Sequence, residues 1–304
     1  MQLSYAGASD VGRVREENQD AIGLPHHPLS GDGVPLFVLA DGMGGRQGGG
    51  LASRMAVATL QEHFARDESR DPRQTLRKGV QKASLAILQK AEDEPQLQGM
   101  GTTIVALAIR DGLAVVANVG DSRAYIFRGG RLRQITEDHS LVAQQVRQGL
   151  LSLQEAKSSP LRHIITKAAG AMPNVEPDVF HEHLEDGDIL LMCSDGLHGP
   201  VEEAQIAKVL SSRQPLTDQV GELLKQANQA GGPDNISVIL VRVDNKATTG
   251  EMANVTGDLT EKLPGGPASQ QDPAAGGSAM TKPFVYLVPL AAAALGLWWY
   301  FSNN

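Results

Sequence analysis

The sequence predicts an α+β fold in which helices pack against an antiparallel β-sandwich. Apolar runs are joined in pairs by short turns that contain glycine, as in β-hairpins. Segments with helical spacing of apolar residues stand between these runs in blocks, which argues against the strand–helix alternation of a parallel sheet. An apolar content of 41% is enough for a sizeable core.

The predicted strands and helices fall within residues 1–244. Residues 102–119 predict a hairpin that turns at Asp111-Gly112, and residues 124–136 repeat the pattern around Gly129-Gly130. Apolar residues that recur every three or four positions predict helices. Further strands are expected at 35–40, 188–194 and 236–243, and helices around 51–64 and 76–87.

The composition changes near residue 245 and divides the chain into three parts. Residues 1–244 form the working domain, and residues 245–283, rich in Gly, Pro and Ala, predict a flexible linker. Residues 284–301 carry no charge and, as a helix, would span about 27 Å, close to the thickness of a bilayer core. We therefore predict a C-terminal transmembrane helix. A helix that docks on the domain or lies at a membrane surface is the alternative.

The residues around this segment predict its orientation. Trp298, Trp299 and Tyr300 gather at its far end, as in an interfacial aromatic belt, and Lys282 precedes it. By the positive-inside rule we expect a single-pass C-terminal anchor in the inner (cytoplasmic) membrane, with the domain in the cytoplasm. The first ten residues lack the pattern of a secretory signal.

The charge balance and the single cysteine argue against several classes of protein. The chain has 27 Lys and Arg against 35 Asp and Glu, a net charge of −8, whereas nucleic-acid binders present a basic face. We therefore expect no nucleic-acid partner. Cys193 alone can form neither a disulfide framework nor a thiolate zinc cluster, and the eight histidines show no metal-ligand spacing.

Residues 35–50, PLFVLADGMGGRQGGG, join a predicted strand to a glycine-rich stretch that invites comparison with nucleotide sites. A dinucleotide fingerprint counted from Gly42 needs glycine where the chain has Gln47. A P-loop counted from Gly44 needs lysine where the chain has Gly50. The stretch therefore does not predict a nucleotide site, which leaves a simple turn or a metal site.

Aspartates at the ends of strands predict a metal site. Asp41 and Asp195 each follow a buried apolar run, whereas Asp111 lies in a hairpin turn. Three more acids stand at strand ends: Asp20, Asp121 and Asp234. Clustered carboxylates repel one another unless cations neutralise them, and oxygen ligands suit Mg²⁺ or Mn²⁺. Taken singly, an aspartate in such a position is more often a turn residue or a cap.

Seven stretches follow one another in a characteristic order. They are VREENQD (14–20), ADGMGG (40–45), GMGTT (99–103), NVGDSRAY (118–125), DHSLV (138–142), CSDGL (193–197) and GGPDNIS (231–237). Together they resemble the bacterial form of the metal-dependent protein phosphatase 2C family, over almost all of residues 1–244. The resemblance implies two antiparallel sheets sandwiched between helices on both faces (α-β-β-α) and hydrolysis of phosphoserine and phosphothreonine in proteins.

The resemblance also implies a place for the acids around two Mn²⁺ or Mg²⁺ ions. Asp41 would bridge the two ions, and the carbonyl of Gly42 would complete one of them. Asp195 and Asp234 would hold the other ion, and Asp20 would orient its waters.

Further roles follow from the same resemblance. Asp121, with Asp195, matches the position of a third, weaker ion seen in bacterial members. Arg15 would clamp the substrate phosphate through its planar donor fork. Animal members have a histidine, proposed as the leaving-group acid, where this chain has Met43, so the general acid is left without a residue. A metal-activated hydroxide would attack phosphorus directly, without a phospho-enzyme.

The expected substrates are phosphorylated proteins. Residues 138–170 match the bacterial flap region, and we expect this segment to select phosphoprotein substrates. Family context and the predicted tether suggest a serine/threonine kinase as partner or target. One alternative is a pseudophosphatase that binds phosphoproteins without turnover, against which the intact acids argue. A phosphatase of small phosphate esters is another, which the sequence leaves open.

Overall fold

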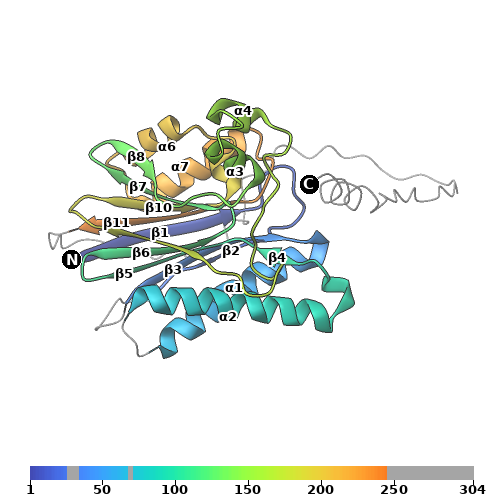
Figure 1. Cartoon of the computed structure of the whole chain (residues 1–304). Coiled ribbons are helices and arrows are strands. Elements are labelled where there is room, and N and C mark those ends of the chain that lie inside the picture. The colour runs from blue at the N-terminus through green and yellow to red at the C-terminus, as the bar shows by residue number, and fades with distance from the viewer. Residues whose placement is uncertain (26–33, 68–70, 245–304) are drawn as a thin grey trace, which may run out of the picture. The chain divides into compact units, whose positions relative to one another are not determined.

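The computed structural model describes residues 1–25, 34–67 and 71–244, which lie within one compact unit, Met1–Glu261. Two antiparallel sheets form its centre (Figure 1). The first sheet has the order β1 (Gln2–Asp10), β11 (Ile236–Asp244), β10 (Ile189–Cys193), β7 (Arg123–Arg128) and β8 (Arg131–Gln134). The second has the order β2 (Asp20–Gly23), β3 (Leu36–Met43), β5 (Ile104–Arg110), β6 (Leu113–Val119) and β9 (Asp178–His183), with β4 (Gly101–Thr102) paired to β3.

Helices cover the outer face of each sheet, which confirms the predicted α-β-β-α arrangement (Figure 1). The second sheet carries α1 (Gly45–Arg66) and α2 (Pro72–Asp93), followed by the short 3₁₀ helix η1 (Pro95–Leu97). The first sheet carries α5 (Asp195–His198), α6 (Glu203–Leu210) and α7 (Leu216–Gln229). The predicted flap contains α3 (Leu141–Arg147) and α4 (Leu153–Ser158).

Three apolar cores explain why the central strands read as continuous apolar runs. Along β3, Phe37 and Leu39 face the core between the sheets, whereas Val38 and Ala40 face the core under α1 and α2. A third core lies between the first sheet and α7. Because side chains alternate along a strand, a strand buried on both faces needs an apolar residue at every position.

The two predicted hairpins are confirmed, and their turns have the backbone that the sequence required. Asp111 and Gly112 adopt φ values of 50° and 77°, and Gly129 and Gly130 adopt 57° and 82°. Positive φ at both central residues is the geometry of a two-residue turn whose twist matches the flanking strands.

The glycine-rich stretch after Asp41 is not a simple turn, because its glycines form the first turns of α1. A side chain on Gly49 would lie 2.6 Å from Oε1 of Gln19, and one on Gly48 would lie 2.8 Å from Cβ of Met100. These glycines let the helix approach its neighbours closely, and this packing outweighs their low helix propensity.

Residues 245–283 and 284–301, the predicted linker and transmembrane helix, lie outside the described residues. Within the residues that are described, none of the helices has the length and apolar character that crossing a bilayer requires.

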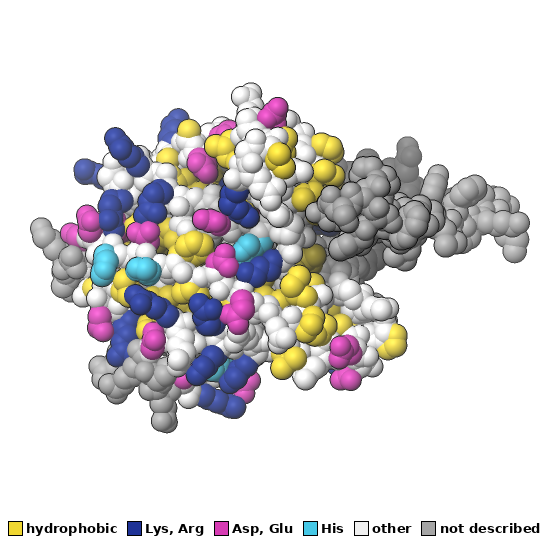
Figure 2. Space-filling model, in the orientation of Figure 1, with side chains coloured by type: hydrophobic (Ala, Val, Ile, Leu, Met, Phe, Trp, Pro, Cys, Tyr) yellow, Lys and Arg dark blue, Asp and Glu magenta, His cyan; other side chains and the backbone are white. Residues whose placement is uncertain are grey.

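On the face shown in Figure 2, basic and acidic side chains are interspersed.

Candidate metal centre

Asp20 and Asp41 stand opposite each other in the register of β2 and β3, so their side chains project from the same face of the sheet. Burial raises the pKa of Asp20 to about 7, and the nearby charges of Asp195 and Asp234 add to this effect. Burial, followed by the charge of Asp20, raises the pKa of Asp41 well above its ordinary value. The two carboxylates therefore resist ionising together.

Asp41 is fixed by the paired threonines at 102 and 103. The Asp41 amide donates to Oγ1 of Thr103 at 3.0 Å, and the Thr103 amide donates to the Asp41 carbonyl at 2.9 Å. The hydroxyl of Thr102 donates to the same carbonyl at 2.8 Å. The backbone at Asp41 thus has little freedom, and its side chain is presented from a rigid strand.

Gly42 has no room for a side chain. A Cβ atom there would overlap the carbonyl of Gly49 in α1 and lie 2.6 Å from the carbonyl of Gln19. Glycine is therefore required at position 42 because β3 passes close to two neighbouring backbones.

Asp195 and Asp234 come from the first sheet and meet the acids of the second. Asp195 begins α5 just after β10, and Asp234 lies two residues before β11. Ser194 connects the sheets, because its hydroxyl donates to Oδ2 of Asp20 at 2.9 Å and accepts from the Ser237 amide at 3.0 Å. No local pattern in the sequence marks Ser194 as a structural contact of this site.

Asn235 holds the loop before Asp20 in place, a role that the sequence analysis also missed. Its Oδ1 accepts from the Gln19 amide at 2.8 Å, and its Nδ2 donates to the carbonyls of Val11 and Glu17 at 2.9 and 3.0 Å. The only sequence signal was the position of Asn235 within GGPDNIS.

Arg15 reaches the acidic cluster from this loop. Its guanidinium donates to Oδ2 of Asp234 at 2.7 Å, and its side chain is 52% exposed. The residue predicted to bind phosphate therefore stands at the open edge of the cluster, next to an acid predicted to bind metal.

Asp121 lies in the turn between β6 and β7 and is buried. Burial raises its pKa to about 7, and the charges of Asp195 and Asp138 add to this. For Asp195 the effect of burial is outweighed by His163, His198 and Arg15, which lower its pKa below the ordinary value. Nδ1 of His163, from the flap, lies 3.8 Å from Oδ2 of Asp195.

The five predicted acids fit a cation site. Each lies at the end of a strand or within two residues of it, and neighbouring negative charges raise the pKa values of Asp20, Asp41 and Asp121, which opposes their ionisation. Oδ1 of Asp20 and Oδ1 of Asp195 are buried without a hydrogen-bond partner, as expected for oxygens available to a hard cation. Within residues 1–25, 34–67 and 71–244, no three acidic or histidine side chains already surround one point as a finished ligand set.

Comparison with known proteins assigns this fold to a family. The model of the protein phosphatase 2C family matches residues 12–241. The serine/threonine phosphatase stp of Listeria monocytogenes is 40% identical over 240 residues, which cover 78% of this chain and 94% of that protein. The protein phosphatase PhpP of Streptococcus pneumoniae is 38% identical over 241 residues, covering 78% and 96%.

Solved structures of bacterial serine/threonine phosphatases have the same fold as this chain. The serine/threonine phosphatase of S. agalactiae has a TM-score of 0.75 and 39% identity, covering 80% of this chain and 100% of that one. The catalytic domain of the phosphatase PstP in complex with 2 manganese ions has a TM-score of 0.70 and 34% identity, covering 80% and 99%. These matches define a protein serine/threonine phosphatase, as the sequence predicted. The chain belongs to the protein phosphatase 2C family.

Proposed function

We propose that the chain hydrolyses phosphoserine and phosphothreonine in proteins with the help of two Mn²⁺ or Mg²⁺ ions bound at its acidic cluster. The observation that carries this proposal is the convergence of acids on buried strand ends, with two buried carboxylate oxygens left without partners. When bound, such ions activate water at neutral pH and offset charge on the phosphoryl group.

The residues divide this work as follows. Asp41, with the carbonyl of Gly42, would hold the ions from the second sheet, and Asp195 and Asp234 would hold them from the first. Asp20 would orient water, since one of its oxygens accepts from Ser194 and the other is unpartnered. This division is supported by the two-sheet origin of the acids.

Arg15 would bind the phosphoryl group of the substrate. Its guanidinium is half exposed while one of its nitrogens is held by Asp234. Anchored in this way, the planar fork can present its other N–H groups to phosphate oxygens.

The test is phosphate release from a phosphothreonine peptide. We expect turnover with Mn²⁺, none after chelation with EDTA, and a loss of at least about a hundredfold in Asp195→Asn. Asp111→Asn is the matched control, because Asp111 lies in an exposed hairpin turn whose positive φ asparagine tolerates. Turnover that persists in EDTA would contradict the proposal.

We propose a third, weaker ion between Asp121 and Asp195, supported by the effect of Asp195 on the pKa of Asp121.

All five acids are in place, so this site gives no support to a pseudophosphatase that only binds phosphoproteins. A small phosphate ester assayed beside the peptide tests whether protein substrates are preferred.

The flap at residues 138–170 would select these protein substrates. His163 brings it to Asp195, and Leu150, Leu153 and Ile164 are exposed on it. If exchange of the flap for a short loop left the ratio of phosphoprotein to small-ester rates unchanged, this role would be wrong.

The proposed setting is the inner face of the cytoplasmic membrane. Residues 284–301 would anchor the chain there, near a serine/threonine kinase whose phosphorylated products it would dephosphorylate. The uncharged sequence of this segment supports the anchor. The full-length chain should sediment with membranes and need detergent for extraction. Recovery in the soluble fraction without detergent would contradict anchoring.

A further inference from the structure

The turn that carries Asp121 depends on contacts from outside itself. Gly120 has a φ of 106°, and a side chain there would lie 2.6 Å from Cγ2 of Thr103. Asp121 and Ser122 then connect β6 to β7 without belonging to either strand. Such irregular backbone is placed by the groups that hydrogen-bond to it.

His139, at the base of the flap, holds one side of this turn. The Gly120 amide donates to Nδ1 of His139 at 3.0 Å, and the His139 amide donates to the Gly120 carbonyl at 3.0 Å. A backbone amide can only donate, so Nδ1 carries no proton and the ring proton is on Nε2. Nε2 lies 3.1 Å from Oδ2 of Asp178, which fixes this tautomer.

His198 holds the other side. Its Nε2 lies 3.1 Å from the carbonyl of Asp121, which can only accept, so this nitrogen carries the proton. His198 ends α5, and Asp195 begins the same helix. The hydrogen bond therefore links the backbone of Asp121 to the short helix that presents Asp195.

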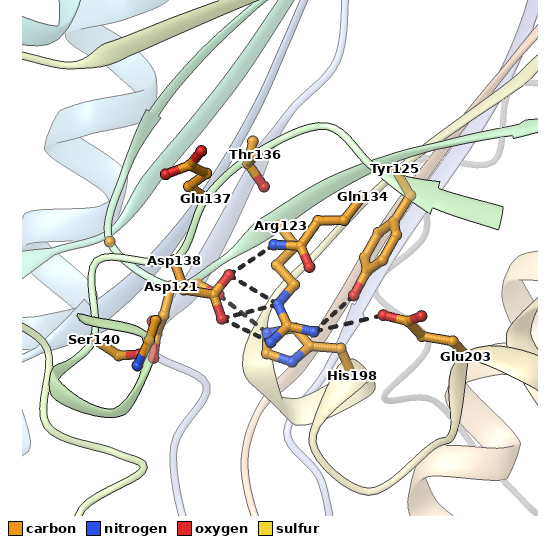
Figure 3. A network of polar contacts seen from close by, with 12 residues as sticks. Asp121, Arg123, Tyr125, Gln134, Thr136, Glu137, Asp138, Ser140, His198 and Glu203 are labelled. Atoms are coloured by element: carbon orange, nitrogen blue, oxygen red, sulfur yellow. Dashed lines mark hydrogen bonds and ion pairs between the residues drawn. The ribbon is translucent and has the colours of Figure 1, made fainter. Parts of the chain in front are cut away.

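An ion pair reinforces the link between the turn and the flap base. Arg123, two residues after Asp121, donates from Nε to Oδ1 of Asp138 at 2.9 Å and from its terminal nitrogen to Oδ2 at 2.7 Å. Figure 3 shows this guanidinium between Asp138 and Tyr125, with Asp121 and His198 in the same view. The segments 120–123 and 138–139 are thus joined at both ends.

We propose that His139 and His198 are positioning residues that set the place of Asp121 relative to Asp195, each through one ring nitrogen. His139 acts through an accepting Nδ1, and His198 acts through a donating Nε2. The two histidines touch neither substrate nor ion in this scheme. The inference rests on the proposed function, in which Asp121 and Asp195 share the weakest-bound ion.

Asparagine and glutamine separate the two ring positions. The side-chain oxygen of asparagine stands where Nδ1 of histidine stands, and the amide nitrogen of glutamine can stand where Nε2 stands. His139→Asn should therefore retain the contact with Gly120, and His139→Gln should lose it. At His198 the order reverses: His198→Gln should retain the contact with Asp121, and His198→Asn should lose it.

The measurement is calorimetric titration of the metal-free protein with Mn²⁺, beside the Mn²⁺ requirement for phosphate release. His139→Gln and His198→Asn should raise the Kd of the most weakly bound Mn²⁺ by about tenfold or more, as substitutions of residues that orient metal ligands do. The opposite variants should stay within about threefold of the wild type. The control is His181→Gln, since His181 is exposed on β9, and it should match the wild type.

Equal effects of Asn and Gln at both positions, or unchanged Mn²⁺ binding in all four variants, would overturn the proposal. A second measurement needs no variant and no metal. Nitrogen-15 spectra of the rings should show both histidines protonated on Nε2 alone at neutral pH; a proton on Nδ1 of His139 would overturn the assignment. A wild-type protein that binds no Mn²⁺ would instead contradict the proposed function, while the ring spectra still test the histidine geometry.

Discussion

Asp20 and Asp41 are direct partners across β2 and β3, so two carboxylates face each other on one side of a sheet. Like charges at directly opposite positions destabilise a pair of strands. A fold that retains this pair stores repulsion that a bound cation would relieve. Metal binding and stability should therefore be coupled in this protein.

The first prediction concerns the pH dependence of the metal-free protein. The pKa of Asp20 and that of Asp121 rise from 3.8 to about 7 on folding, chiefly through burial. A raised carboxyl pKa stabilises the fold at low pH, and that contribution is lost as the pH rises through about 7. The Tm without metal should thus be higher at pH 5.5 than at pH 7.5.

The effect of Mn²⁺ on Tm should have the opposite pH dependence. Protons compete with the ion for the same carboxylates, so the gain in Tm on adding Mn²⁺ should be larger at pH 7.5 than at pH 5.5. Differential scanning calorimetry at both pH values, with and without Mn²⁺, checks both statements. A metal-free Tm that rises between pH 5.5 and 7.5 would contradict the repulsion.

The second prediction is that Asp20→Asn stabilises the metal-free protein while impairing turnover. The substitution removes one of the two opposed charges and keeps the size of the side chain. We expect a gain of about 1 kcal/mol in the free energy of unfolding at pH 7.5, roughly 2–4 °C in Tm for a domain of this size. Thermal unfolding at pH 7.5 measures it, and a lower Tm than that of the wild type would count against the account.

Gly42→Ala should be strongly destabilising. The added methyl group would overlap the Gly49 carbonyl of α1, and neither backbone can move without disturbing the strand or the helix. We expect a loss of about 2 kcal/mol or more in the free energy of unfolding, together with weaker Mn²⁺ binding. Urea unfolding measures the loss.

Gly221→Ala is the matched control for this prediction. Gly221 lies within α7, and a side chain there meets nothing within 4 Å. Alanine should stabilise the helix by up to about 1 kcal/mol. If the two substitutions had the same effect, close packing at Gly42 would not be the reason for its glycine.

Arg15→Lys should raise the KM for a phosphothreonine peptide by about tenfold. Lysine keeps the charge but loses the planar fork that can hold Asp234 and a phosphate at once. Steady-state kinetics at saturating Mn²⁺ separate KM from kcat. An unchanged KM would remove Arg15 from the phosphate site.

The sequence was informative where signals are local. The residue types at Asp111-Gly112 and Gly129-Gly130 predict the two turns. Continuous apolar runs predict the central strands. The buried positions of α7 also recur with helical spacing, a signal that was present but passed over: Leu216, Val220, Leu223, Leu224 and Ala227.

Other elements had no such signal. β1 and β9 are edge strands with few fully buried residues, so neither shows a clear apolar pattern. The glycines of α1 predict a loop by propensity, and only the close approach of Gln19 and Met100 explains them in a helix.

The candidate site divides in the same way. The acids were identifiable because each stands at the end of a strand or within two residues of it. Ser194, Asn235, His139 and His198 act through contacts between residues far apart in the chain, which no local pattern reports.

Titration of the metal-free protein with Mn²⁺ tests the central claim most directly. At pH 7.5 we expect at least two ions per chain in the wild type and loss of the tight sites in Asp41→Asn. Absence of Mn²⁺ binding to the folded wild-type protein, or unchanged binding in Asp41→Asn, would contradict the assignment of the acidic cluster as a two-ion site.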